Sequence, residues 1–160
     1  MQSGNIWVGV VASTNAVVVV QMEGGAGDQP SQILADDTVK VERGNRPKAL
    51  RTLHQRLVDL GKNIAPYRVV VKASAMPPSG GGKALLSAAE VRGVVQAALA
   101  ESAPVEAVAR NIASRRFGER DFSSYIDDDE FWAENTRGKL RKGSREAALL
   151  VLAAIDQENG

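Results

Sequence analysis

The 160-residue chain contains no cysteine and only one histidine. The absence of cysteine excludes a disulfide framework, a thiolate zinc site and thiol catalysis. With His54 as the only imidazole, we expect neither a histidine-based metal site nor a histidine-dependent catalytic triad. The chain therefore has no thiol for nucleophilic catalysis and only one imidazole for acid–base catalysis or metal binding.

The chain also has almost no net charge. Twenty basic residues stand against nineteen acidic ones, which leaves a net charge of +1. No overall field draws such a chain to nucleic acid or to a membrane, so binding of that kind has to come from local clusters of charge.

Long hydrophobic runs are missing as well. The first residues carry no basic cluster, and Ser13-Thr14-Asn15 interrupts the apolar segment that follows them. We therefore expect neither a signal peptide nor a membrane span, and we predict a cytoplasmic protein without a membrane partner. A length of 160 residues with 44% hydrophobic content suits one core and is short for two, which predicts a single domain over residues 1–160.

The most informative stretch runs from residue 68 to residue 100. Residues 69–71 are three consecutive valines, typical of a strand that is buried on both faces, and Lys72 follows at the strand's end. Ser87-Ala88-Ala89-Glu90 has the form of a capping box, which predicts the start of a helix. A strand, a loop and a helix in this order predict half of an α/β crossover.

The loop in this stretch ends in Gly80-Gly81-Gly82-Lys83 and invites comparison with phosphate-binding loops. Pro77 stands where such a loop needs its first glycine, and Ala84 replaces the Ser or Thr that binds magnesium. We therefore do not expect a nucleotide site here. Contact of Lys83 with a nucleic-acid backbone and a plain connection both remain open.

The elements before this stretch can be placed from their patterns. Residues 6–12 and 16–22 predict a β-hairpin, and a third strand is expected near residues 33–42. Asn45 and Pro47 predict the start of a helix that ends at Gly61.

The elements after it are less regular. Residues 104–109 fit either a short edge strand or a helix, and periodicity does not decide between them. Short helices and loops are expected over residues 110–145, with the acidic run 127–130 at the first turn of a helix that carries Phe131 and Trp132. Ser144 then predicts the start of a buried last helix over residues 145–157.

This order of elements resembles the ribonuclease H-like fold, and in particular its Holliday-junction-resolvase (RuvC-like) branch. The resemblance rests on IWVGVVAST as the first strand, RVVVKAS as the fourth, GGGKALLSAAEVRGVVQAALA after it and GSREAALLVLAAI as the last helix. It implies an α/β fold with a mixed five-stranded sheet, in which an antiparallel hairpin and a third strand precede parallel strands, and helices flank the sheet.

The resemblance also implies where catalytic residues would lie. Enzymes of this branch hold two divalent ions between carboxylates at the ends of the first and fourth strands and near the start of the last helix. Those positions fall at Val11, Lys72 and Glu146 in this sequence. One carboxylate cannot hold two hard cations, so we predict no metal site and no catalytic residues, and we expect the Lys72 ammonium to take the place of a metal ion and pair with a phosphate.

We therefore predict a non-catalytic nucleic-acid-binding or accessory module that uses no cofactor, with DNA favoured over RNA as the partner. Two alternatives stay open. One is a structure-selective nuclease that depends on Mg or Mn and uses a rearranged acidic set of Glu146, Asp36 and Asp37. The other is a scaffold with a protein partner. The residues expected to contact phosphate are basic: Lys72, Lys83, Arg92, Arg115, Arg116, Lys139, Arg141, Lys142 and Arg145.

Overall fold

The computed structural model describes residues 4–73, 82–115, 118 and 120–160. The strands are β1 (Ile6–Ala12), β2 (Ala16–Glu23), β3 (Ser31–Lys40), β4 (Arg68–Lys72), β5 (Val105–Val108) and β6 (Thr136–Arg137). The helices are α1 (Arg46–Ile64), α2 (Lys83–Leu99), α3 (Arg110–Arg115), α4 (Phe122–Ile126), α5 (Asp129–Asn135) and α6 (Arg145–Asn159), and the 3₁₀ turn η1 (Lys142–Ser144) directly precedes α6.

The strands form one mixed sheet in the order β5-β4-β1-β2-β3-β6. β1 and β2 make the predicted antiparallel hairpin, and a hydrogen bond of 2.9 Å from the backbone N–H of Ser13 to the carbonyl of Ala16 closes its turn. β4 lies parallel to β1, and β5 lies parallel to β4. The prediction that the first and fourth strands are neighbours is confirmed.

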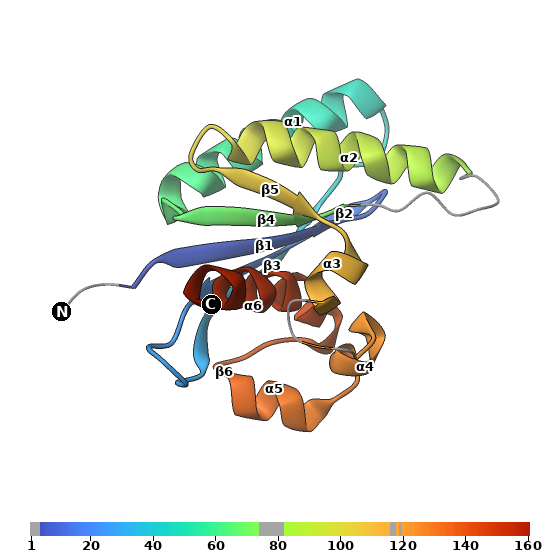
Figure 1. Cartoon of the computed structure of the whole chain (residues 1–160). Coiled ribbons are helices and arrows are strands. Elements are labelled where there is room, and N and C mark those ends of the chain that lie inside the picture. Colours follow the sequence, from blue (N-terminus) through green and yellow to red (C-terminus); the bar gives the residue numbers. More distant parts are fainter. Residues whose placement is uncertain (1–3, 74–81, 116–117, 119) are drawn as a thin grey trace.

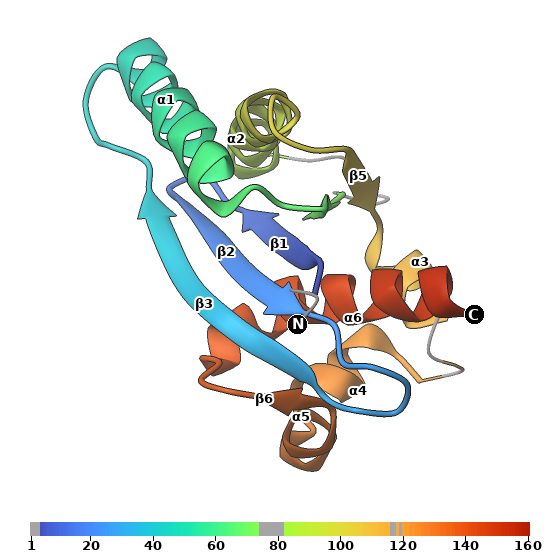
Figure 2. The same ribbon diagram turned by 90° about the vertical axis from the view of Figure 1, so that its left-hand side faces the viewer.

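Helices cover both faces of the sheet (Figure 1, Figure 2). α1 and α2 pack on one face, while α6 packs on the other and separates the sheet from α4 and α5. The valines of β4 alternate between these layers, since Val69 and Val71 face α1 and α2 whereas Val70 faces α6. Burial on both faces explains why three consecutive residues of this strand are apolar.

The sheet has one strand more than the five predicted. β6 consists of only two residues, and it pairs in parallel with the start of β3, Thr136 opposite Ser31. A two-residue strand has no periodicity of its own, so the sequence does not reveal it. β3 itself runs from Ser31 to Lys40 and not from residue 33 to residue 42.

Two predicted helix boundaries are wrong. α1 does not end at Gly61 but continues to Ile64, where Ala65 adopts a left-handed conformation (φ 50°) and donates its backbone N–H to the carbonyl of Gly61. α2 begins at Lys83 with Gly82 in the capping position, so Ser87 lies inside the helix and caps nothing. The run of alanines and leucines from residue 84 onward favours helix strongly enough to extend it before the Ser87 box.

The remaining elements agree better with the sequence. Residues 104–109 contain strand β5, so the strand alternative is the correct one. Short helices follow as expected, and Asp128 caps α5 by accepting a hydrogen bond of 3.0 Å from the backbone N–H of Phe131. The last helix starts at Arg145 as predicted and ends two residues later than expected, at Asn159. The glycine-rich loop before Lys83 falls almost entirely outside the described residues.

Among the helices that the structure describes, none has the length and apolar character needed to cross a lipid bilayer.

α6 lies unusually close to β1 because Gly9 has no side chain. A Cβ atom at this position would collide with the backbone carbonyl of Ala147 and would lie 2.8 Å from Cγ2 of Val151. The close approach brings the first turn of α6 over β1 and β4, and it therefore positions Glu146.

We expect Gly9→Ala to lower the free energy of unfolding by about 1–3 kcal/mol, because the added methyl group forces α6 away from the sheet. Urea denaturation followed by circular dichroism measures the change. Gly93→Ala is the matched control: Gly93 lies in the interior of α2, and no atom lies within 4 Å of the place that an added methyl group would take, so alanine should stabilise the helix by up to about 1 kcal/mol. Equal effects of the two substitutions would contradict this account of the packing.

Candidate functional site

The carboxyl ends of β1 and β4 lie side by side at one edge of the sheet, and α6 covers one face of the sheet there. Val10 lies opposite Val71 in the register of the two strands, so Val11 and Lys72 come next in the same row. Val11 packs against the buried hydrophobic cluster that contains residues 147–154 of α6, and Val70, which is two residues before Lys72, belongs to the same cluster. Because side chains two residues apart on a strand share a face, Lys72 also points toward α6.

Glu146, the second residue of α6, meets two cations at this point. Its Oε1 forms an ion pair with the ammonium of Lys72. Its Oε2 lies 3.3 Å from Nη2 of Arg110, the first residue of α3. The three side chains, which we call the ion triad, remain partly open to solvent, with exposed fractions of 28% for Lys72, 21% for Glu146 and 48% for Arg110. The ion triad thus places two positive charges and one negative charge at an accessible point of the fold.

Comparison with known proteins gives a structural relationship without a sequence relationship. No protein-family model and no curated protein sequence matches this chain. Thermus thermophilus RuvC in complex with a Holliday junction substrate matches the structure with a TM-score of 0.75 at 12% sequence identity, over 96% of this chain and 95% of that one. The chain has the fold of a Holliday junction resolvase.

Two further solved structures agree with this assignment. Another structure of Thermus thermophilus RuvC gives a TM-score of 0.72 at 14% identity, with 96% of each chain covered. The yeast mitochondrial Holliday junction resolvase Ydc2 gives 0.61 at 11% identity, over 96% of this chain and 78% of that one. The ribonuclease H-like, RuvC-like fold predicted from the sequence is therefore confirmed.

The three residues at which the resemblance to resolvases implies metal ligands, Val11, Lys72 and Glu146, do not fit a pair of Mg or Mn ions. Such ions need several oxygen ligands each. Val11 offers none, Lys72 adds a positive charge, and Glu146 is the only carboxylate of the three. In the part of the chain that the structure describes, no three Asp, Glu, His or Cys side chains come together where a metal ion could bind.

Arg110 is the member of the ion triad that the sequence analysis misses. Its guanidinium lies over the ring of Phe122, 5.0 Å from the centroid, which helps to hold it beside Glu146. The signal that could have found it is the assignment of residues 104–109. Once these residues form a strand parallel to β4, with Val108 opposite Lys72, a residue just after Val108 must lie near Lys72.

The other basic residues predicted to contact phosphate do not join the ion triad. Lys83 and Arg92 both lie on α2, the first exposed and the second half-buried. Arg115 is exposed at the end of α3, and Arg116 lies outside the described residues. Their contact with phosphate stays a prediction.

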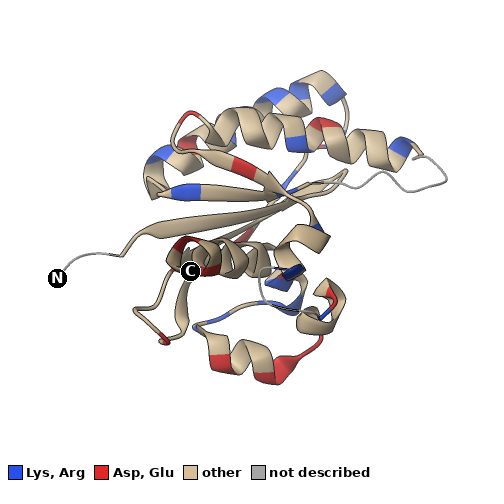
Figure 3. Cartoon of the chain, viewed as in Figure 1, with Lys and Arg blue, Asp and Glu red and all other residues tan. Residues whose placement is uncertain are grey.

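The basic run before α6 is divided among separate partners. Arg145 is the most enclosed, with 13% of its side chain exposed; it pairs with Asp129 at 2.8 Å and donates to the carbonyl of Ile126, so it ties α6 to α4 and α5. Figure 3 shows that α5 carries several acidic positions. Lys142 lies 3.5 Å from Asp127 at the surface, and Lys139 is exposed. The run is therefore no single cluster, and Arg145 has a structural role that the sequence does not indicate.

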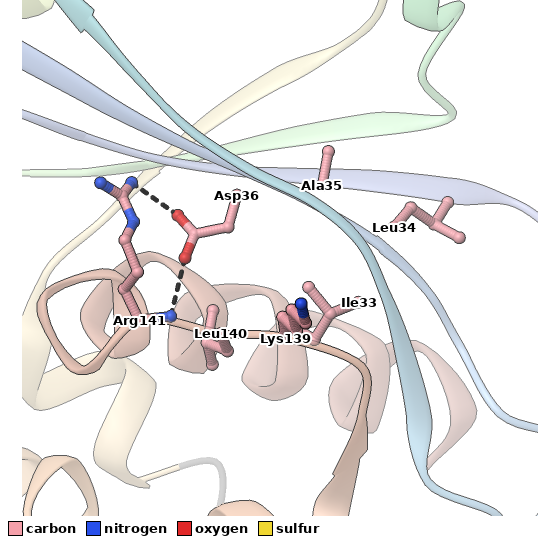
Figure 4. Close-up of a pocket in the computed structure, with 7 residues that line it drawn as sticks. All are labelled: Ile33, Leu34, Ala35, Asp36, Lys139, Leu140 and Arg141. Carbon is pink, nitrogen blue, oxygen red and sulfur yellow. Dashed lines mark hydrogen bonds and ion pairs between the residues drawn. The ribbon is translucent and has the colours of Figure 1, made fainter.

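Asp36 and Arg141 join β3 to the segment before α6. The carboxylate of Asp36 accepts hydrogen bonds from the backbone N–H of Arg141 (2.8 Å), from its guanidinium (2.7 Å) and from the hydroxyl of Ser144 (2.6 Å). Figure 4 shows the first two of these bonds inside a pocket between β3 and the segment. That pocket is lined by Ile33, Leu34, Ala35, Asp36, Lys139, Leu140 and Arg141.

In these hydrogen bonds the carboxylate of Asp36 acts as the acceptor and the hydroxyl of Ser144 as a donor. Ser144 therefore does not cap α6 with its side chain, contrary to the expectation. Asp37 comes next on the strand and so points to the opposite face of the sheet from Asp36. Asp36 reaches the start of α6 through Ser144, two residues before Glu146, but within the described residues Asp36, Asp37 and Glu146 do not come together as a group that could hold a metal ion.

The environment of Asp36 lowers its pKa. Burial acts to raise the pKa of this carboxyl, but the hydrogen bonds from Arg141 and Ser144 outweigh burial and favour the ionised form. A carboxyl group with a lowered folded-state pKa stabilises the fold above its unfolded-state pKa of about 4, and this stabilisation is lost as the pH falls through the folded-state value.

We expect Asp36→Asn to lower the free energy of unfolding by about 1–3 kcal/mol at pH 7, because an amide replaces the charge in three hydrogen bonds. The difference from wild type should shrink as the pH falls from about 4 toward the lowered folded-state pKa of Asp36, because the unfolded chain binds the proton first and the folded wild type becomes neutral only below that value. Urea denaturation at pH 7 and at pH 3 measures both effects. Asp37→Asn, at the exposed neighbouring position, should change stability little at either pH, and a pH-independent loss for Asp36→Asn would contradict the assigned role of the charge.

Proposed function

We propose that this chain is a nucleic-acid-binding domain that contacts the phosphate backbone, preferably of DNA, and does not cleave it. The observation that carries the proposal is the ion triad. At the point where catalysis in this fold needs metal ligands, the chain has two cations, Lys72 and Arg110, around the single carboxylate Glu146.

The ion triad has donors left for an external anion. A lysine ammonium has three N–H donors and an arginine guanidinium has five, whereas Glu146 offers only two oxygens. With about a quarter of Lys72 and half of Arg110 exposed, a phosphate oxygen can reach both cations. An ammonium does not lower the pKa of a bound water molecule as a divalent ion does, so this arrangement supports binding and not hydrolysis.

The structural relatives support DNA as the partner. Thermus thermophilus RuvC, whose fold this chain shares, is bound to a Holliday junction substrate in one of the matching structures. With a net charge of only +1 on the chain, the affinity has to come from local contacts such as the ion triad.

Incubation of the protein with branched and with single-stranded DNA, in magnesium or in manganese, tests the proposal. We expect binding in a gel-shift assay without any cleavage product, and we expect the affinity to fall steeply between low and moderate salt, because phosphate contacts release counterions. Cleavage in either metal would instead support the nuclease alternative. The absence of both binding and cleavage would favour the protein scaffold.

Within this proposal, Lys72→Met should raise the Kd for DNA about fivefold to tenfold and lower the slope of log K against log salt by about one, because it removes one phosphate contact. Fluorescence anisotropy with a labelled duplex measures both quantities. Lys62→Met is the control, since Lys62 is equally basic but lies in the last turn of α1, away from the ion triad.

The opposite change is expected for Glu146→Gln. Its carboxylate competes with a phosphate for Lys72 and Arg110, so removing its charge should lower the Kd about threefold to tenfold in the same assay. An unchanged Kd for both Lys72→Met and Glu146→Gln, with thermal stability retained, would rule out the ion triad as the phosphate contact.

A further inference from the structure

A second basic surface lies on α1, in a part of the chain without any predicted contact residue. Between residues 40 and 56 the sequence has six basic residues and one acidic residue, whereas the rest of the chain has fourteen basic and eighteen acidic residues. Figure 3 shows basic positions gathered on α1, while acidic positions gather on α5 at the far side of the molecule. Although the net charge is close to zero, basic residues are therefore concentrated on and just before α1, and the rest of the chain has an excess of acidic residues (Figure 3).

Side chains of this segment surround a shallow hollow of about 550 Å³, which we call the α1 groove. It is lined by Glu42, Lys48, Arg51, Thr52, Gln55 and Arg56. Four of these residues, at positions 48, 51, 52 and 55, follow the spacing of one helical stripe. The opposite side of α1 is held against the sheet by Ala49, Leu53 and Leu57, so the stripe faces outward.

The charge of the α1 groove is available to a ligand. Its one acid, Glu42, already pairs with Arg56 at 3.2 Å. The side chains of Lys48 and Arg51 are exposed, and within the described residues neither makes an ion pair or a hydrogen bond. The same holds for Lys40 and Arg43 beside the groove. Thr52 adds a neutral hydroxyl donor between the cations, which suits the oxygens of a phosphate, whereas the side-chain amide of Gln55 donates to Asp59 at 3.1 Å.

The start of α1 and the ion triad lie at the same edge of the sheet but on its two opposite faces, because α1 packs on one face and Lys72 points toward α6 on the other (Figure 1). β1, β3 and β4 run in one direction, so they end together at what we call the carboxyl edge, with Lys72 at the end of β4 and Lys40 at the end of β3. Three strand spacings separate these two lysines, about 14 Å. A single small anion cannot span that distance, whereas a nucleic-acid strand covers it in about four nucleotides at roughly 3.4 Å each.

A network around Arg46 holds the elements of the carboxyl edge together. Its guanidinium donates to the carbonyls of Thr14, at the tip of the β1–β2 hairpin, and of Ser87, on α2, each at 3.2 Å. The hydroxyl of Thr14 donates in turn to the carbonyl of Ala84 at 3.2 Å. The start of α1, the hairpin tip and the start of α2 are thus tied to one another, which gives the α1 groove a defined position relative to β1 and β4.

We propose that the α1 groove binds the phosphate backbone of the same nucleic acid that the ion triad contacts, so that the bound strand follows the carboxyl edge from Lys72 to Lys48 and Arg51. This inference rests on the proposed function, and it adds a second contact site and the path between the two sites. The ligand is a polyanion whose phosphates are read without regard to base, because the groove offers cations and short polar side chains and no aromatic surface.

The test uses a double substitution, Lys48→Gln with Arg51→Gln, in the full chain. With a labelled duplex of about 20 base pairs, we expect the Kd to rise about tenfold and the slope of log K against log salt to fall by about two, one for each lost phosphate contact. Lys62→Gln with Arg68→Gln is the control, because it removes the same formal charge at the opposite edge of the sheet, where α1 ends and β4 begins. It also removes the surface ion pair of Arg68 with Glu158 at 3.4 Å, a contact that contributes at most about 1 kcal/mol. We expect the control to change the Kd less than twofold.

The outcomes separate this inference from the proposed function. If wild-type protein binds DNA and Lys72→Met weakens it, but Lys48→Gln with Arg51→Gln does not, the α1 groove is refuted and the ion triad stands. Equal losses for the double variant and its control also refute the groove, because only overall charge then matters. If the wild type binds no nucleic acid in low salt, the proposed function itself fails. All four substituted side chains are exposed, so melting temperatures close to wild type are expected for both double variants.

Discussion

The close contact between α6 and β1 at Gly9 is the constraint on which the rest of the structure depends. Because the helix backbone lies directly on the strand, the first turn of α6 is held over the ends of β1 and β4. Glu146 thereby reaches Lys72, and Arg110 reaches the same carboxylate from the end of β5. The chain keeps the geometry of the resolvase fold, while the meeting point holds an ion triad where metal-dependent catalysis needs oxygen ligands.

This difference in charge alters what the position can do. Clustered carboxylates repel one another, and metal ions between them offset that repulsion, whereas Glu146 attracts both Lys72 and Arg110 and lies between these two cations. The spare donors of the two cations suit an anion from outside. In the proposed function, the ion triad and the exposed cations of the α1 groove together provide the contacts for a phosphate backbone, even though the chain as a whole is nearly neutral.

The sequence patterns were most reliable where burial dictates residue type. The valine runs of β1, β2 and β4 and the leucine spacing of α1 identified those elements, because a strand or helix packed in a core must be apolar at regular positions. Helix boundaries were less reliable. Ser87 suggested a helix start, but the helix already begins at Lys83. Gly61 suggested a helix end, but it lies inside α1, where an added Cβ atom would lie 2.8 Å from the hydroxyl oxygen of Ser102. Strand β6 was not predicted, because a strand of two residues shows no alternation of apolar and polar side chains.

By itself, the sequence indicated the elements that are packed in the core and excluded thiol chemistry. Through its resemblance to the resolvase branch it also implied the fold class and placed Val11 and Lys72 at two positions where metal ligands would be needed. The first two conclusions follow from residue type and local periodicity, and the others from the resemblance. Only the tertiary structure decided which charges meet: Glu146 with Lys72 and Arg110, Asp36 with Arg141 and Ser144, and Arg145 with Asp129. The physical reason is that the strand order and the packing of the helices determine which polar side chains lie close enough to interact. The partners in these pairs are separated by 16 to 108 positions in the sequence, so local patterns do not reveal them.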